Sequence, residues 1–209
     1  MRRIGLAVLV SLGSLVPGQA QTAAQVKARP STDWPCRAIK VADISLAAVW
    51  SGPPITDIAA SAWRDDAGLS ALATLLAARR TPIEAAEQAA HDFAAAQGAD
   101  RRDKLLALFA AVFDRMAHER AQVIAGLDRF GRRQKDLADQ IRTATADMRA
   151  EQDKADADPA KMQDLTNRMT WDMRIFEDKR KSVAYVCETP VLIEQRLFAL
   201  GRIILKELE

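Results

Sequence analysis

The second half of the chain places apolar residues at steps of three and four, the spacing that gathers them on one face of an α-helix. This stripe runs through Leu105, Phe109, Val112, Met116, Val123, Leu127, Phe130, Gln134, Leu137, Ile141, Ala144 and Met148. Between Met116 and Val123 it passes through Arg120, an extra four-residue step of the kind that locally unwinds a supercoil. Elsewhere the spacing is that of a coiled-coil seam and predicts one long helix.

A second stripe with the same spacing follows a strong helix breaker. Its positions are Met162, Leu165, Met169, Met173, Phe176, Arg180, Val183 and Cys187, continuing after Pro190 with Ile193, Leu197, Leu200 and Ile204. The breaker is the sequence ADADP at residues 155–159, where Asp158 is suited to cap a helix and Pro159 to begin it. Two helices joined by so short a turn must lie antiparallel.

Folding the chain at residue 157 predicts which residues of the two stripes face each other. The expected pairs have numbers that sum to about 314 and include Ile141 with Met173, Leu127 with Cys187 and Leu106 with Leu208. Each helix would be about 75 to 80 Å long at 1.5 Å per residue. Gly126 and Gly131 should weaken the first helix at the height where residues 188–190 interrupt the second, because Pro190 has no amide hydrogen to donate.

Shorter helices are expected earlier in the chain. Helical spacing runs through residues 55–80, with an interruption near 64–68. The sequence TPIE at 81–84 has the form of a capping box with Thr81 as N-cap, so a new helix should start there. Gly98 should end it.

Residues 21–54 have an irregular pattern. Prolines stand at positions 30, 35, 53 and 54, and only residues 38–50 could hold a short element. This segment has too few apolar residues for a core of its own, so it should lie as an arm on the helices, with Trp34 and Trp50 as anchors.

These patterns predict an all-α protein in which a long antiparallel two-helix coiled-coil hairpin projects from a small helical base, with an irregular N-terminal arm tied down by one disulfide. The expected parts are a signal peptide at 1–20, the arm at 21–54, a base from 55–127 plus 187–209, and a coiled-coil stalk at 128–186.

The disulfide would join Cys36 and Cys187, the two cysteines of the chain. An even cysteine count in an exported protein favours such a bridge. In the chain-entropy model, closing so long a loop stabilises the fold by about 4 to 5 kcal/mol. Free or metal-bound thiols are the alternative, but neither cysteine has a nearby histidine to complete a ligand pattern.

The first twenty residues have the layout of a secretory signal peptide. Two arginines precede an apolar run from Ile4 to Val16, and the small residues Gly18 and Ala20 flank Gln19 just before the expected cleavage site after Ala20. Cleavage would give a periplasmic or secreted protein, whereas retention would leave an N-terminal anchor. Without those two arginines the chain has 28 basic and 28 acidic residues, a balance that argues against nucleic acid binding. No later segment reaches the length of a membrane span.

The sequence contains no catalytic or cofactor motif. His91 and His118 have acidic residues only as immediate neighbours, which point elsewhere on a helix. A pocket lined by His118, Glu119 and Arg120 is the arrangement that would favour an enzyme. We therefore expect no catalytic residue and no cofactor.

A metal site is also not expected. The acidic run at 153–158 lacks the glycine and the glutamate of a calcium loop. A group of methionines near the turn could bind a soft metal such as Cu(I) or adapt to varied client proteins, but their seam positions favour core filling. These methionines are Met148, Met162, Met169 and Met173.

Trp171 lies in a segment otherwise made of charges and helical spacers, RMTWDMRIF at residues 168–176. If the methionines of this segment and Phe176 face the seam, Trp171 points away from it, and Ile175 lies one turn further along the same outer stripe. An exposed tryptophan beside arginines resembles a binding hot spot. The predicted partner-binding residues are Trp171, Ile175, Arg168 and Arg174. The alternative is that residues 21–35, or a shifted seam, bury them.

These observations favour an exported, non-enzymatic protein that serves as a protein interaction or scaffold module through its hairpin. The partner would be another protein or a second copy of the chain. A periplasmic holdase chaperone is the alternative from another class, and a metal carrier or an enzyme is less favoured.

Overall fold

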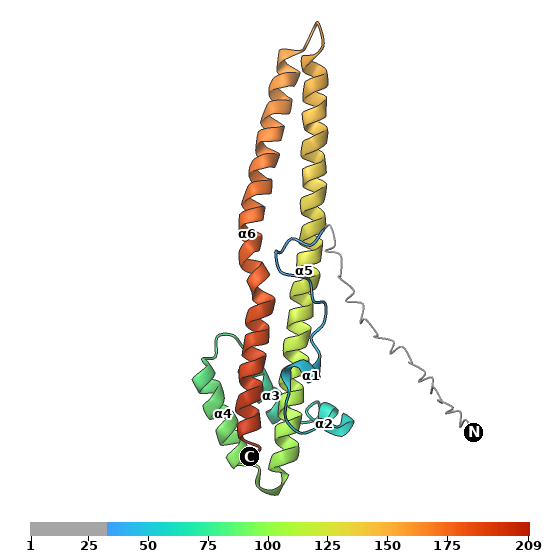
Figure 1. Ribbon diagram of the computed structural model, residues 1–209. Helices are drawn as coiled ribbons and strands as arrows, with labels where there is room; N and C mark the ends of the chain where they lie inside the picture. Colours follow the sequence, from blue (N-terminus) through green and yellow to red (C-terminus); the bar gives the residue numbers. More distant parts are fainter. Residues whose placement is uncertain (1–32) are drawn as a thin grey trace, which may run out of the picture.

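The computed structural model describes residues 33–209, which form six α-helices and one short 3₁₀ helix. In chain order these are α1 (Leu46–Val49), α2 (Asp57–Ala62), α3 (Ala67–Ala77), α4 (Ile83–Ala95), η1 (Gly98–Asp100), α5 (Arg101–Gln152) and α6 (Pro159–Lys206). Two helices dominate, since α5 has 52 residues and α6 has 48. The four shorter helices gather around one end of this pair, and the other end projects as a bare hairpin (Figure 1). The predicted all-α fold is confirmed.

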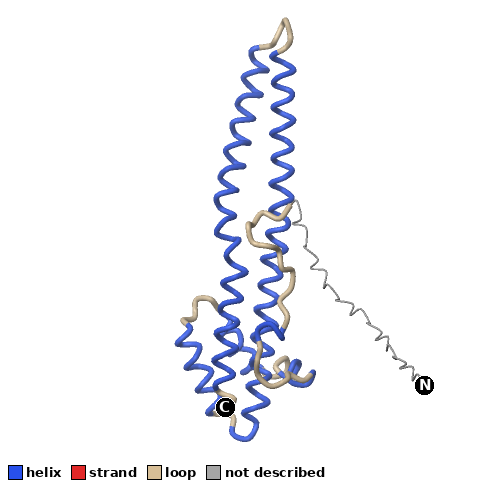
Figure 2. The backbone as a smooth tube through the Cα atoms, in the orientation of Figure 1, coloured by secondary structure: helices blue, strands red, loops and turns tan. Residues whose placement is uncertain are grey.

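The turn of the hairpin lies where the sequence placed it. The carboxylate of Asp158 accepts hydrogen bonds from the amides of Ala160 at 2.9 Å and Lys161 at 3.4 Å, and Pro159 is the first residue of α6. Outside the helices, the described chain consists of loops and turns, as the tube in Figure 2 shows. A capped proline start directly after a short turn sends α6 back along α5.

Side-chain contacts confirm the predicted register of the two long helices. The Thr145 hydroxyl lies 3.5 Å from the Met169 sulfur, and the Thr166 hydroxyl lies 3.9 Å from the Met148 sulfur. In both pairs the residue numbers sum to 314. The same sum holds for a third pair far down the hairpin, Arg120 with Glu194. One register therefore extends along most of both helices.

The base holds the core of the protein. Residues 105–112 of α5 are all buried, because α6 covers one side of the helix and α2 and α3 pack on others. A helix surrounded in this way must be apolar on every face. Trp50 of the arm stacks on Phe109 with 4.2 Å between ring centroids, so the predicted anchoring role of Trp50 is confirmed.

The stalk has a thinner seam, and two predicted seam residues, Met173 and Arg180, are exposed instead of lying in it. Met173 is 51% exposed, whereas Asp172 and Phe176 are half-buried. The seven-residue spacing from Leu165 selects residue 172 after Met169 rather than the apolar Met173 one step later. In a two-helix seam the geometry of the repeat, and not hydrophobicity alone, decides which residues face the partner helix.

The predicted interruption of the second long helix at residues 188–190 is wrong. Helix α6 continues through Pro190, which is buried and faces the hairpin interior. Proline costs one backbone hydrogen bond, but packing along a helix of this length offsets that loss. Gly131 also serves another purpose, because a Cβ atom there would overlap the Asp33 carbonyl where the arm crosses α5.

The short helices begin close to where the sequence predicts, and the start of α4 differs by one residue. The break expected near 64–68 is present between α2 and α3, and Asp66 caps α3 by accepting a hydrogen bond from the Leu69 amide at 2.9 Å. Helix α4 begins at Ile83 with Pro82 as its N-cap, so the capping box centred on Thr81 is not formed as predicted. The Pro82 carbonyl accepts the first helical bond, which moves the helix start by one residue.

Arg120 connects three separate parts of the chain. Its Nε donates to the Glu194 carboxylate at 2.6 Å, and its two terminal nitrogens donate to the carbonyls of Ala42 at 3.0 Å and Val41 at 2.9 Å. The Arg120 side chain is only 4% exposed. A buried guanidinium must have its hydrogen-bonding capacity satisfied, and here α6 and the arm satisfy it together.

Replacing Arg120 with methionine should lower the free energy of unfolding by about 3 kcal/mol, because the Glu194 carboxylate would lose its buried partner. Urea denaturation measures this loss. Arg79→Met is the matched control, since Arg79 pairs with Glu119 at 3.8 Å on the surface and should cost less than about 1 kcal/mol. Equal losses in the two variants would contradict the proposed role of Arg120.

Glu151 bridges the two helices at the tip of the hairpin. Its carboxylate accepts hydrogen bonds from Lys154 at 2.8 Å and from Lys161 of α6 at 2.6 Å. The hydrogen bond from Lys154 and then that from Lys161 hold the pKa of Glu151 at about 2, below its ordinary value of 4.5. The ionised form is therefore favoured in the folded hairpin.

This lowered pKa predicts how the tip responds to acid. A depressed carboxylate pKa stabilises the folded state above the ordinary value of 4.5, and the contribution is lost as the pH falls through the folded value of about 2. Proton exchange of the tip amides should therefore accelerate relative to the base in that window, and Glu151→Gln should remove the acid dependence. A carboxyl carbon-13 titration of Glu151 with a midpoint near its ordinary value would contradict this.

Candidate protein interaction surfaces

The Trp171 side chain is exposed on the outer face of the stalk. It is 62% accessible, and Arg168 and Arg174, three residues before and after it, are exposed as well. Residues separated by three or four positions share a helix face. Ile175 is only half-buried because it lies closer to the edge of the seam. The structure thus brings the four predicted residues together on α6, with Trp171 the most prominent apolar side chain among them.

The described part of the arm does not cover Trp171. The arm enters at Asp33, whose carboxylate lies 3.5 Å from Lys135 of α5, and it proceeds from there toward the base. The alternative in which residues 21–35 bury Trp171 rests mainly on residues before 33, which lie outside the described part of the chain. The predicted signal peptide and its cleavage site after Ala20 lie outside it too.

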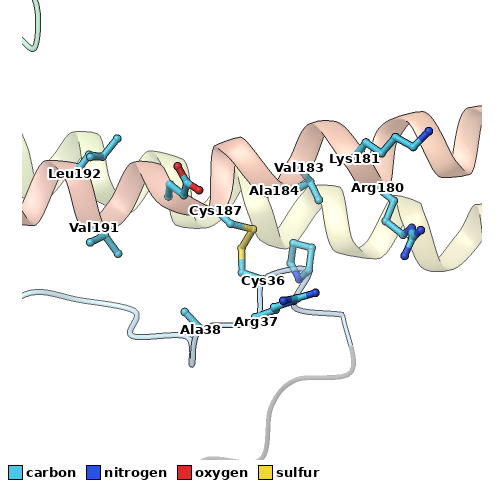
Figure 3. A pocket seen from close by; sticks show the side chains of 12 residues that line it. Cys36, Arg37, Ala38, Arg180, Lys181, Val183, Ala184, Cys187, Val191 and Leu192 are labelled. Atoms are coloured by element: carbon cyan, nitrogen blue, oxygen red, sulfur yellow. A yellow bond between two sulfur atoms is a disulfide. The ribbon is translucent and has the colours of Figure 1, made fainter.

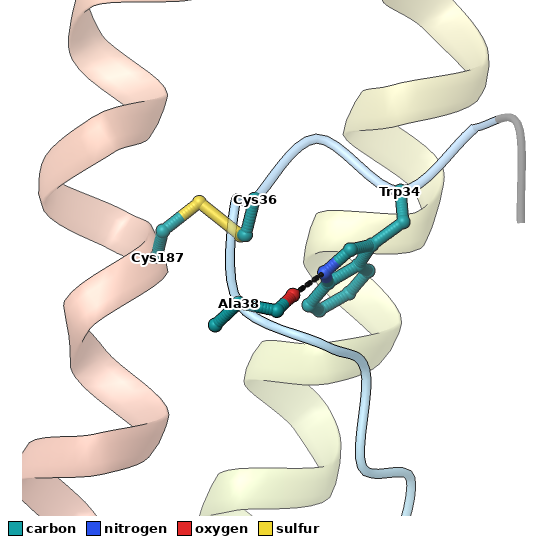
Figure 4. Close-up of a disulfide and its surroundings, with 4 residues drawn as sticks. All are labelled: Trp34, Cys36, Ala38 and Cys187. Atoms are coloured by element: carbon teal, nitrogen blue, oxygen red, sulfur yellow. Dashed lines mark hydrogen bonds between the residues drawn. A yellow bond between two sulfur atoms is a disulfide. The ribbon is translucent and has the colours of Figure 1, made fainter. Parts of the chain in front are cut away.

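The disulfide predicted from the sequence is present. Cys36 and Cys187 are joined, with their Cα atoms 5.6 Å apart, and the bond ties the arm to α6. Within the arm, Trp34 Nε1 donates a hydrogen bond to the Ala38 carbonyl at 2.8 Å (Figure 4), and the Asp33 carboxylate lies 3.5 Å from Lys135 of α5. Lys40 adds an ion pair with Asp128 of α5 at 2.7 Å. The arm therefore bridges both helices at the base of the stalk.

An open groove of about 980 Å³ lies between this arm and α6. Sequence reasoning missed it. Its floor is mostly apolar, with Val183, Ala184, Val191 and the disulfide, and its rim carries Arg37, Arg180 and Lys181 (Figure 3). Val191 and Leu192 are 46% and 49% exposed. The signal available in the sequence was the run VLI at 191–193, which is too wide to face α5 alone.

Residues 118–120 do not form a common pocket. His118 is exposed and lies 2.9 Å from the Gln122 side chain, Glu119 pairs with Arg79, and Arg120 is engaged with α6 and the arm. The arrangement that would favour an enzyme is therefore not formed. Adjacent residues on a helix point in different directions, which separates the three side chains.

The other histidine lies at the far end of the base. His91 of α4 is 3.2 Å from the buried Glu207 carboxylate, which Arg101 also contacts at 3.3 Å. This cluster joins α4, α5 and the end of α6, so it has a clear structural role. Within residues 33–209, no group of three or more His, Cys, Asp or Glu side chains is placed to hold a metal ion.

Most of the methionines considered as a soft-metal site lie in the seam. Met148, Met162 and Met169 are half-buried, and the sulfurs of Met148 and Met169 each face a threonine hydroxyl across the hairpin. Met173 lies apart from them on the surface. Flexible thioethers fill irregular space in a helix seam well, which accounts for the three half-buried methionines.

Comparisons with protein-family models, with curated proteins and with solved structures found no match to this chain. Among the helices of the described chain, none is long and apolar enough to cross a bilayer.

Reduction of the disulfide should release only the first part of the arm. Residues 33–38 lose their covalent tie to α6, whereas Arg120 still holds the carbonyls of Val41 and Ala42. Hydrogen–deuterium exchange should therefore accelerate in residues 33–38 and stay unchanged in α1. The oxidised Arg120→Met variant should show the reverse, with faster exchange beyond residue 40. A uniform increase through residues 33–54 upon reduction would contradict this division.

Proposed function

We propose that the protein is an exported, non-enzymatic interaction module whose hairpin presents the Trp171 face to a partner protein. The observation that carries this proposal is a tryptophan 62% exposed on a projecting two-helix stalk. Exposing such a side chain to water is unfavourable, and tryptophan is among the residues most enriched at the energetic centres of protein interfaces.

Trp171 is an apolar centre with charged residues on either side of it. Arg168 and Arg174 are exposed on either side, and neither has a hydrogen-bond or ion-pair partner among residues 33–209. Unpaired arginines at the edge of an apolar contact favour partners with carboxylates at matching positions, and they accelerate encounter more than they tighten the complex. The half-buried Ile175 would extend the apolar contact toward the seam.

The hairpin would act mechanically in this function. Trp171 lies about four helical turns of α6 before Cys187, where the disulfide joins the arm, so a partner can approach it without contacting the short helices. The continuous register of α5 and α6 makes the stalk a firm support, which lowers the entropy lost on binding. The disulfide and the predicted signal peptide both favour a protein that works in the periplasm or outside the cell.

Holdase activity is a second candidate, supported by a different observation. Exposed apolar side chains recur along α6 on more than one of its faces, and they include Met173, Tyr185, Val186, Val191, Leu192 and Phe198. Apolar groups exposed at several places on a helix can contact unfolded clients of varied sequence. Suppression of light scattering by an aggregating, unrelated protein would favour this function over a single specific partner.

Replacing Trp171 with alanine should abolish partner capture without harming the fold. Proteins retained from a periplasmic extract by the wild type should bind the variant at least about 30-fold more weakly, the loss typical of an interface hot spot. Sedimentation velocity of the purified chain tests self-association in the same way. Helical circular dichroism and the melting temperature should remain unchanged, because the side chain is exposed.

Met173→Ala is the matched control for this experiment. Met173 is also an exposed apolar residue, 51% accessible, but two residues along α6 its side chain points to the other flank of the helix. It should retain full partner capture. The proposal fails if Trp171→Ala binds as well as the control, or if it destabilises the monomer by several kcal/mol, which would mark Trp171 as a packing residue.

A further inference from the structure

The groove beside the disulfide has the length of a short helix. Its α6 wall extends from Arg180 to Leu192, which corresponds to about 18 Å at 1.5 Å per residue. Its other wall is the arm at residues 35–38. Val191 and Arg180 of α6 extend toward the side on which the arm lies (Figure 3). The space therefore runs parallel to α6 and accommodates about three helical turns.

The arm wall is fixed in place before any partner arrives. The disulfide holds Cys36, Arg120 binds the carbonyls of Val41 and Ala42, and Lys40 pairs with Asp128. With these groups turned toward the hairpin, the neighbouring apolar side chains face solvent, and Ile39 is 80% exposed. A preformed wall lowers the conformational cost of binding.

The spacing on the α6 wall fits a helical occupant. Val183, Pro190 and Leu197 recur every seven residues, face the hairpin interior and are buried. The next residue in each case, Ala184, Val191 and Phe198, repeats the same spacing and is exposed. A seven-residue apolar repeat is the pattern of a helix-to-helix seam. Ala184 and Val191 of this second stripe line the groove with no helix of the described chain packed on them, whereas Phe198 lies beyond the groove and beside α1.

The charges at the rim select an acidic partner. Arg37 and Lys181 are exposed and pair with no carboxylate in the described chain, while Arg180 contacts Glu177 at 2.8 Å. Glu188 is the one acidic residue that lines the groove. An apolar floor with a basic rim complements a helix whose apolar stripe is flanked by carboxylates.

We propose that this groove binds an amphipathic helix of another protein, one with glutamate or aspartate beside its apolar stripe. The site is separate from the Trp171 face. Trp171 lies nine residues before Arg180, the nearest lining residue on α6, which is about 13 Å along the helix axis. It also points away from the groove flank. A helix can therefore bind in the groove whether or not Trp171 binds a partner.

Two synthetic peptides test the proposal on the intact, oxidised protein. Both contain three heptads with leucine at the seam positions, and they differ only in carrying glutamate or lysine at the flanking positions. Like charges on both flanks keep each peptide from pairing with itself. Fluorescence anisotropy at low salt should show the glutamate peptide binding at least about tenfold more tightly, and added salt should reduce this difference.

Variants then locate the binding. Val191→Asp should weaken the glutamate peptide at least about tenfold, and Arg37→Glu with Lys181→Glu should reverse the preference between the peptides. Tyr185→Asp is the matched control, because Tyr185 is 78% exposed on α6 but does not line the groove. Trp171→Ala should also leave peptide binding unchanged. Circular dichroism checks that each variant remains folded.

Several outcomes would overturn the proposal. Equal binding of the two peptides, or binding of neither, would exclude an acidic helix as the occupant. A dimer in sedimentation velocity that Val191→Asp dissociates would show that a second copy of the chain fills the groove instead. Binding of the protein to anionic phosphatidylglycerol vesicles, lost in Arg37→Glu, with no peptide preference would identify the basic rim as a lipid contact.

Discussion

The arrangement of α5, α6 and the arm depends on the hydrogen bonds of the Arg120 guanidinium. This guanidinium lies in the core-facing stripe of α5 and is satisfied only when Glu194 of α6 and the carbonyls of Val41 and Ala42 are all in place. A buried charge without such partners would cost several kcal/mol. The arm is consequently held at one height and in one direction, with Lys40 turned inward and Ile39 turned outward.

The base and the stalk differ in how completely their helices are covered. In the base, α2, α3 and α4 surround the long pair, and α5 is buried on all sides at residues 105–112. In the stalk only two helices are present, and each can bury just one face against the other. Apolar residues on the outer faces, such as Trp171, remain accessible for a geometric reason. A hairpin of this kind can bind partners wherever an apolar residue replaces a charged one on its outer face.

The two candidate surfaces occupy different flanks and heights of α6. Trp171 is a single large anchor on the stalk, whereas the groove is an elongated apolar floor beside the disulfide. One helix can carry both surfaces because side chains at different positions along it point in different directions. Both surfaces are built on α6. Helix α5 packs along the opposite side of α6, and the arm forms the second wall of the groove.

The sequence by itself determined the architecture, because its signals there are local or periodic. Asp158 and Pro159 define the turn, the heptads define the register, and the two cysteines define one bridge. Each of these depends on short-range geometry or on simple pairing, which a single sequence contains.

The tertiary structure decided the details that depend on what packs beside each residue. Pro190 stays helical because neighbouring helices support it, and Met173 is exposed because the seam repeat excludes it. In the sequence, Arg120 is a polar residue within the apolar stripe of α5. Only the folded chain shows that carbonyls of the arm accept its hydrogen bonds. The groove arises from two segments 151 residues apart in sequence, at the two ends of the disulfide. Such a space has no periodic signature, so no spacing along the chain predicts it.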